Sequence, residues 1–111
     1  MKIQSCLLAL LIPVFSAHAA EKNIIVPSDP NGNYALVEKS GNAGKRVVVT
    51  KREGFLGVMY SKRVYDCQNR TVNLVGTGAT LEILEQSRPV SGMGPIIRDS
   101  TAEDIHAEAC S

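Results

Sequence analysis

Few side chains could carry covalent or acid–base chemistry, and the main candidates are Cys67, Cys110 and His106. A nucleophile needs a general base within hydrogen-bonding reach, and a zinc site needs three or four convergent ligands. The pattern places no serine, thiolate or second histidine beside His106 to complete either arrangement. We therefore expect His106 to lie on the flank of a helix, and we predict no catalytic residue and no metal ligand.

Paired carboxylates are the remaining candidates for acid–base work. Glu82 and Glu85 form one pair, and Glu103 and Asp104 form the other. Acidic side chains near the start of a helix are stabilised by the helix dipole while they stay solvated, which is the commoner reason to find them there. An enzymatic alternative stays open at this point, namely a small hydrolase that uses these carboxylates with His106.

Asp29, Asn31 and Asn33 fall at alternate positions, as in a calcium-binding loop. A calcium loop of that type also needs a glycine directly after the third ligand and a glutamate at the twelfth position. This chain has Tyr34 and Ser40 at those two places. We therefore predict a turn without a metal here, and no cofactor for the protein.

The start of the chain has the features of a secretory signal peptide. Lys2 precedes an apolar run, and Ala17 and Ala19 fit the small-residue pattern of a cleavage site. Cys6 stands at the start of the apolar run and not directly after the cleavage position, so we expect no stable membrane anchor. The predicted organisation is a signal peptide at 1–19, a strand and linker at 20–33, and one domain at 34–111, in a periplasmic or secreted protein.

Export determines the expected chemistry of the cysteines. Disulfides form and persist in oxidising compartments, and Cys67 and Cys110 are the pair that remains once the leader with Cys6 is removed. Their bridge would close a loop of about 44 residues, for which the loop-entropy model gives about 4 kcal/mol of stability. We predict that this bridge fastens the C-terminal helix to a sheet.

The charge pattern limits the class of partner. The chain has 12 basic and 11 acidic residues, and loss of Lys2 with the leader would make it neutral, which argues against nucleic acid as a partner. Cationic side chains nevertheless crowd the segment 45–70, whereas the segment 99–108 is acidic. We expect the acidic helix and the basic sheet to neutralise each other.

Runs of β-branched residues between turn-forming residues predict the sheet. The expected strands cover 45–51, 58–67 and 71–75, with a preceding strand at 34–38 and an edge strand within 21–26. Gly76 and Gly78 are expected in a turn, and Ile96–Ile97 in a short strand or an extended segment.

Two helices complete the expected fold. One or two helical turns are predicted over 81–86, with Thr80 as the N-cap, and Ser100 with Glu103 forms the capping box of a final helix that ends at Cys110. The predicted fold class is α+β: a small antiparallel β-sheet with a short helix and a C-terminal helix tied to the sheet by a disulfide.

The turn before the second of these strands has an unusual composition. Phe55 and Leu56 stand between Gly54 and Gly57, where two consecutive large apolar residues are uncommon. We expect them to fold back over the sheet edge as a minor core; the alternative is a contact surface. On that alternative, the turn and its cationic flanks bind a protein partner, for which an acidic surface would be favoured, through Lys51, Arg52, Phe55, Leu56, Lys62 and Arg63.

Several features between Val49 and Cys110 occur together in one known family. In chain order they are Lys51-Arg52, a glycine-bounded turn, the strand ending Tyr65-Asp66-Cys67, Arg70, Gly76-x-Gly78, Leu81, Pro95 and a terminal helix ending in Cys110. In these features the chain resembles the surface-adhesin E family of small exported bacterial domains. The resemblance implies an antiparallel sheet with a disulfide-fastened helix. It also implies an adhesin or, more often, a periplasmic protein, so we expect an exported, non-enzymatic binding or accessory protein.

Overall fold

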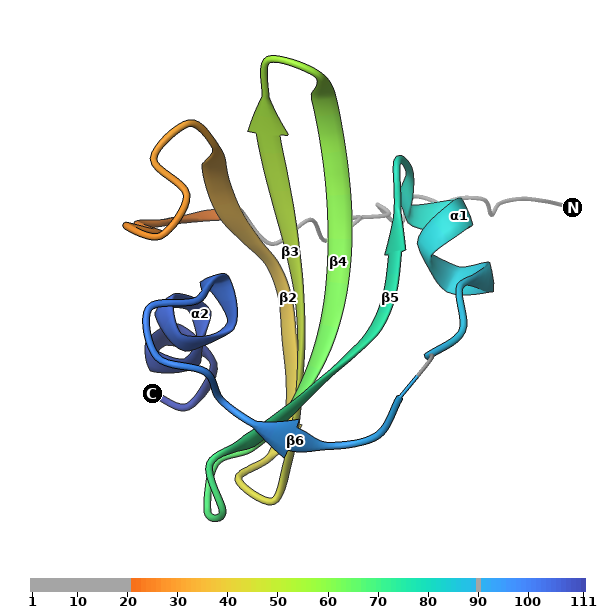
Figure 1. Ribbon diagram of the computed structural model, residues 1–111. Coiled ribbons are helices and arrows are strands. Elements are labelled where there is room, and N and C mark those ends of the chain that lie inside the picture. Colours follow the sequence, from red (N-terminus) through yellow and green to blue (C-terminus); the bar gives the residue numbers. More distant parts are fainter. Residues whose placement is uncertain (1–20, 90) are drawn as a thin grey trace, which may run out of the picture.

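The computed structural model describes residues 21–89 and 91–111, so the predicted signal peptide lies outside the described residues. The described chain forms a six-stranded antiparallel sheet in which the strands neighbour one another in sequence order (Figure 1). The strands are β1 (Lys22–Ile24), β2 (Asn33–Asn42), β3 (Lys45–Gly54), β4 (Gly57–Asp66), β5 (Thr71–Gly78) and β6 (Gly94–Pro95). The helices are α1 (Leu81–Gln86) and α2 (Thr101–Ala109). The predicted fold class is confirmed.

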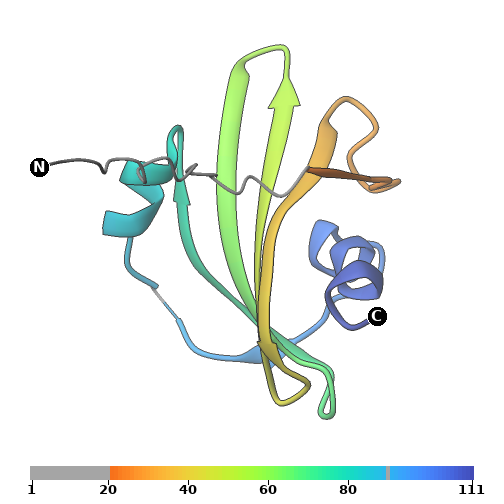
Figure 2. The ribbon, with the colours of Figure 1, turned by 180° about the vertical axis from the view of Figure 1, so that it is seen from behind.

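The two helices lie on opposite sides of the molecule, with α2 beside β2 and α1 beside β5 (Figures 1 and 2). Side chains on a strand alternate between the two faces of the sheet, and one face carries the main core under α2. Its buried apolar residues include Val48 and Tyr65 from the sheet and Ile105 and Ala109 from α2. Tyr65 is fully buried, and its hydroxyl donates a hydrogen bond to the backbone carbonyl of Ala102 at 2.7 Å.

The predicted disulfide joins Cys67 to Cys110, with their Cα atoms 5.7 Å apart. It connects the residue that follows β4 to the residue that caps α2. At the other end of α2, Ser100 is the N-cap, and its hydroxyl accepts a hydrogen bond from the backbone N–H of Glu103 at 3.1 Å. The Glu103 carboxylate reaches back to the N–H of Asp99 and not to that of Ser100. The C-terminal helix is therefore fixed at both ends.

The expected turn at Gly76 and Gly78 is wrong, because both glycines belong to β5. The reason is the close approach of α1. A Cβ atom on Gly78 would lie 2.6 Å from the backbone nitrogen of Leu84, and one on Gly76 would lie 3.3 Å from a methyl group of the same leucine. Leu84 is the buried residue of α1, so glycine in β5 lets this short helix pack directly on the strand.

The N-terminal segment is part of the sheet. The expected edge strand is present as β1, which pairs with β2, and the loop after it docks on α2 through a 2.9 Å hydrogen bond from the Ser28 N–H to the Asp104 carboxylate. The last strand is Gly94–Pro95. Ile96–Ile97, expected in a short strand or an extended segment, is an extended segment. Within 21–89 and 91–111, no helix has the length and apolar character required to cross a bilayer.

Candidate functional site

Phe55 and Leu56 occupy the two-residue turn of the β3–β4 hairpin, between the paired residues Gly54 and Gly57. Phe55 is 100% exposed and Leu56 is 94% exposed. The expectation that they fold back as a minor core is wrong, because both side chains are exposed and the hairpin that carries them extends past its neighbours (Figure 1). Phe55 and Leu56 are therefore exposed on the surface and not packed as a minor core.

Gly57 allows this turn to carry two L-residues with large side chains. Its φ is +122°, whereas neither Phe55 nor Leu56 is among the described residues with positive φ. A tight hairpin turn needs a residue in this conformation to reverse the chain, and glycine adopts it without steric cost. Because Gly57, directly after the turn, adopts that conformation, bulky residues fit at the two turn positions.

Two further apolar side chains continue the exposed surface down β4. Val58 and Met59 are both partly exposed, and consecutive strand residues point to opposite faces of the sheet. We call Phe55, Leu56, Val58 and Met59 the hairpin tip. Sequence reasoning missed the last two residues, although the absence of any polar side chain between Gly57 and Tyr60 was an available signal.

The cationic side chains predicted to flank the turn do not surround it as unpaired charges. The ammonium group of Lys51 lies 2.8 Å from the carboxylate of Glu21. The guanidinium of Arg52 contacts both carboxylate oxygens of Asp29, through Nε at 2.5 Å and Nη2 at 3.2 Å. These two ion pairs use Lys51 and Arg52 to attach the N-terminal segment to β3, which is a structural role.

The pair of Asp29 and Arg52 is extended by Tyr34, whose hydroxyl donates a 2.7 Å hydrogen bond to the same carboxylate. Hydrogen bonding by Arg52 and then by Tyr34 lowers the pKa of Asp29 to about 2. Asp29 therefore acts as an anion that fixes this loop. The first residue of the pattern that resembled a calcium loop thus has a structural role. Within the described residues, no group of three or more His, Cys, Asp or Glu side chains is arranged to hold a metal ion.

Lys62 and Arg63 are neighbours in β4 and therefore point to opposite faces of the sheet. Lys62 stands opposite Gly76, on the face that α1 covers. Arg63 stands opposite Val48, on the face of the main core, and burial lowers the pKa of its guanidinium. Of the six residues predicted to bind a partner, the structure leaves Phe55 and Leu56 free at the tip and distributes the four cations elsewhere.

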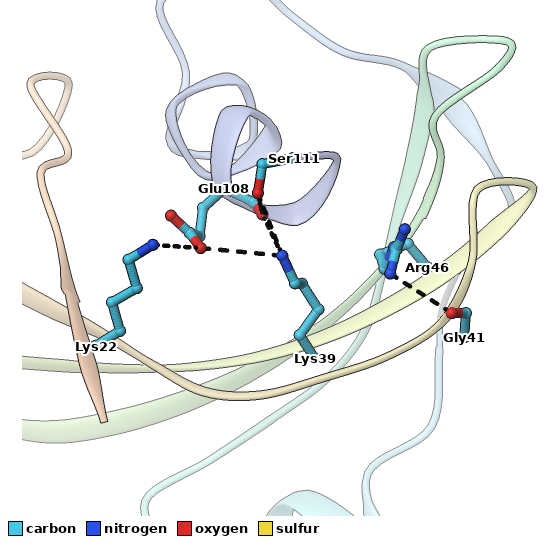
Figure 3. Close-up of polar contacts among 6 residues, drawn as sticks. All are labelled: Lys22, Lys39, Gly41, Arg46, Glu108 and Ser111. Atoms are coloured by element: carbon cyan, nitrogen blue, oxygen red, sulfur yellow. Dashed lines mark hydrogen bonds and ion pairs between the residues drawn. The ribbon is translucent and has the colours of Figure 1, made fainter. Parts of the chain in front are cut away.

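Charge neutralisation between α2 and the sheet occurs at a different place from the one expected. Figure 3 shows Glu108 of α2 between Lys22 and Lys39, which come from β1 and β2. Its carboxylate lies 3.0 Å from the ammonium group of Lys22 and 4.0 Å from that of Lys39. Lys39 also donates to the backbone carbonyl of Glu108 at 3.0 Å. The acidic helix thus pairs with the edge of the sheet and not with the cations of β3 and β4.

His106 lies on the flank of α2, with its ring centroid 5.8 Å from that of Tyr65. Its Nε2 atom is buried and has no hydrogen-bond partner in the described structure. Burial, and then the positive charge of Arg70, lowers its pKa. Two of the carboxylates in the enzymatic alternative have structural contacts: Glu103 accepts from the backbone N–H of Asp99, and Asp104 accepts from that of Ser28.

No family model, curated protein or solved structure matches this chain. The resemblance to the surface-adhesin E family therefore stays a prediction.

Proposed function

We propose that this protein is an exported, non-enzymatic binding or accessory protein that contacts a protein partner through the hairpin tip. The observation that carries the proposal is the nearly complete exposure of Phe55 and Leu56 at the end of a projecting hairpin. Large apolar side chains that are fully hydrated in the free protein gain most when a partner removes them from water, by about 1.5–3 kcal/mol for each fully buried side chain.

The form of the tip supports recognition of an apolar pocket. Interface energy is concentrated in a few central apolar anchors, surrounded by residues that exclude water. Phe55 and Leu56 would be the anchors, and the partly exposed Val58 and Met59 would lie at the margin. The hairpin is fastened by nine residue pairs between β3 and β4, so the turn is presented on an ordered scaffold and loses little entropy on binding.

The proposed location is the bacterial periplasm or envelope. The disulfide between Cys67 and Cys110 is compatible with an oxidising compartment, and the leader pattern of the first residues supports export. The resemblance to the surface-adhesin E family supports the same location and a role in protein binding.

The experiment is a comparative capture from envelope extract with immobilised wild-type protein, Leu56→Ala and Ile97→Ala. Ile97 is the matched control, because it is also an exposed aliphatic residue and lies in the loop before α2. We expect one set of partners that wild type and Ile97→Ala retain and Leu56→Ala loses, with all three proteins equally folded. Equal capture by all three variants would exclude the tip as the binding surface.

A further inference from the structure

Arg63 occupies an unusual place for a charged residue. Its side chain projects from the face of the sheet that carries the main core, opposite Val48 on β3 and Leu74 on β5, and two residues before the fully buried Tyr65. Arg63 is half-buried, and burial lowers the pKa of its guanidinium. A cation in such a place is costly unless an anion neutralises it.

No anion of this chain does so. All 11 acidic residues lie within the described part of the chain, and the ion pairs found there involve Lys22, Lys39, Lys51 and Arg52 as the cations. The Nη1 atom of Arg63 is buried and has no hydrogen-bond partner among the described residues. The nearby phenol groups of Tyr34 and Tyr65 donate to Asp29 and Ala102, and neither oxygen accepts a hydrogen bond from Nη1 of Arg63.

Other buried nitrogen atoms without a hydrogen-bond partner lie around Tyr65. Arg46 is the cross-strand partner of Tyr65, and its Nε atom is buried without a partner. The ring of His106 on α2 lies tilted beside that of Tyr65, and its Nε2 atom is also buried without a partner. Thus, of the four buried side-chain atoms without a hydrogen-bond partner in the described structure, three are nitrogen atoms near Tyr65 on one face of the sheet.

Exposed apolar side chains lie on both sides of Arg63 on this face, with the polar pair Ser61 and Thr77 between Arg63 and Met59. Leu74, its partner on β5, is 45% exposed, and Met59, four residues earlier on the same face of β4, is 43% exposed. The helix α2 lies over the side of this face toward β2 and not over β5 (Figures 1 and 2). We call Met59, Arg63 and Leu74 the β4–β5 strip.

We propose that the β4–β5 strip is a binding site for an organic carboxylate, which pairs with Arg63 through its charged group and covers Met59 and Leu74 with an apolar group. The planar guanidinium matches a carboxylate in shape and charge, and such pairs are strong where water is partly excluded. The Nη1 group of Arg63 has no hydrogen-bond partner among the described residues, and a carboxylate that approaches from the open side would supply one.

The carboxylate could belong to a free amphiphile or to an acidic side chain of an apolar peptide, and two probes separate these sources. Octanoate represents the first, and acetyl-Leu-Glu-Leu-amide represents the second. Acetate supplies the charge without the apolar group, and octanol supplies the apolar group without the charge. Each is titrated into the full mature protein, with amide and methyl NMR signals as the readout.

The key variants are Arg63→Met and Lys62→Met. They are adjacent and remove the same charge, but Lys62 points to the other face, so it is a matched control. We expect octanoate or the peptide to shift the signals of Met59 and Leu74 and to bind at least tenfold more tightly than acetate or octanol. Arg63→Met should abolish this binding and Lys62→Met should keep it. The stronger of the two probes then identifies the source of the carboxylate.

A second readout separates a binding role from a structural one. If Arg63 is kept for a ligand, Arg63→Met should raise the melting temperature of the free protein, because it removes an uncompensated buried charge. Phe55→Ala should bind the carboxylate as wild type does, since Phe55 is not part of the β4–β5 strip. Wild-type protein that binds neither probe, or an Arg63→Met protein that binds as wild type does, would overturn the proposal. A lowered melting temperature of Arg63→Met would also count against it.

Discussion

The guanidinium of Arg52 is joined to both carboxylate oxygens of Asp29, across 23 positions of sequence. This contact holds the loop between β1 and β2 against β3, near the turn end of the β3–β4 hairpin, where Arg52 pairs with Met59. Gly32 lies so close that a Cβ atom there would be 2.5 Å from the Arg52 Nε atom. The loop is therefore shaped around this ion pair, and Arg52 acts in folding and not in the proposed partner contact.

Asp29→Asn should lower stability at neutral pH, because the amide cannot replace the carboxylate between Arg52 and Tyr34. The pKa of Asp29 is about 2 in the folded protein, below its ordinary value of 3.8. A carboxylate whose pKa is lower in the folded protein stabilises the fold at pH values above its ordinary pKa. This contribution is lost as the pH falls through the pKa of the folded state. Denaturant unfolding should thus show a free energy of unfolding that declines from neutral to acid pH in wild type, and this decline should be absent from Asp29→Asn.

Glu53→Gln is the control for this series, since Glu53 forms no ion pair within the described structure. It should keep the wild-type dependence of stability on pH. Equal acid dependence in wild type and Asp29→Asn would contradict the role given to the Arg52 contact.

Cys110→Ser should cost about 2–5 kcal/mol of the free energy of unfolding, because the bridge to Cys67 constrains the unfolded chain over a long loop. Hydrogen exchange should rise first in α2, whose C-terminal end the bridge fixes to the sheet. The double variant with Cys67→Ser should match the single one, as either change removes the same bond. An unchanged exchange pattern in α2 would show that its other contacts suffice.

Protonation of His106 should destabilise the fold. Its folded pKa is lower than the ordinary value of 6.5, so the unfolded chain binds the proton more readily. Stability should therefore fall as the pH drops below that ordinary value, and His106→Gln should reduce the fall. Urea unfolding at about pH 7.5 and about pH 5.5 tests this, since only the second protonates the unfolded histidine.

The same substitution bears on the enzymatic alternative. Nothing in the described structure is placed to activate His106, so folded His106→Gln protein should capture partners as wild type does. Loss of that capture in a folded variant would contradict the non-enzymatic proposal.

The sequence predicted the sheet, both helices and the disulfide, because these features depend on local signals. β-branched runs marked β3, β4 and β5, Thr80 and Ser100 marked the helix starts, and export left one pair of cysteines. The error at Gly76 and Gly78 has a tertiary cause. Glycine pairs also mark turns, and only the approach of α1 shows that these two provide space on a strand.

The candidate site was less predictable because charge partners come from distant segments. Lys51 and Arg52 were grouped with the turn by sequence proximity, whereas Glu21 and Asp29 neutralise them in the fold. Strand parity could have separated Lys62 from Arg63, but the sequence did not show that Arg63 shares a face with the main core. The exposure of Phe55 depends on how far the hairpin extends past its neighbours, which no local pattern specifies.

The most direct test of the hairpin tip measures stability and partner affinity on the same Phe55→Ala protein. Because Phe55 is fully exposed, the free energy of unfolding should change by no more than about 0.5 kcal/mol. Affinity for the captured partner should fall by about 1–3 kcal/mol, because a buried anchor is lost. A Phe55→Ala protein that is clearly destabilised, or that binds the partner with undiminished affinity when folded, would contradict the account.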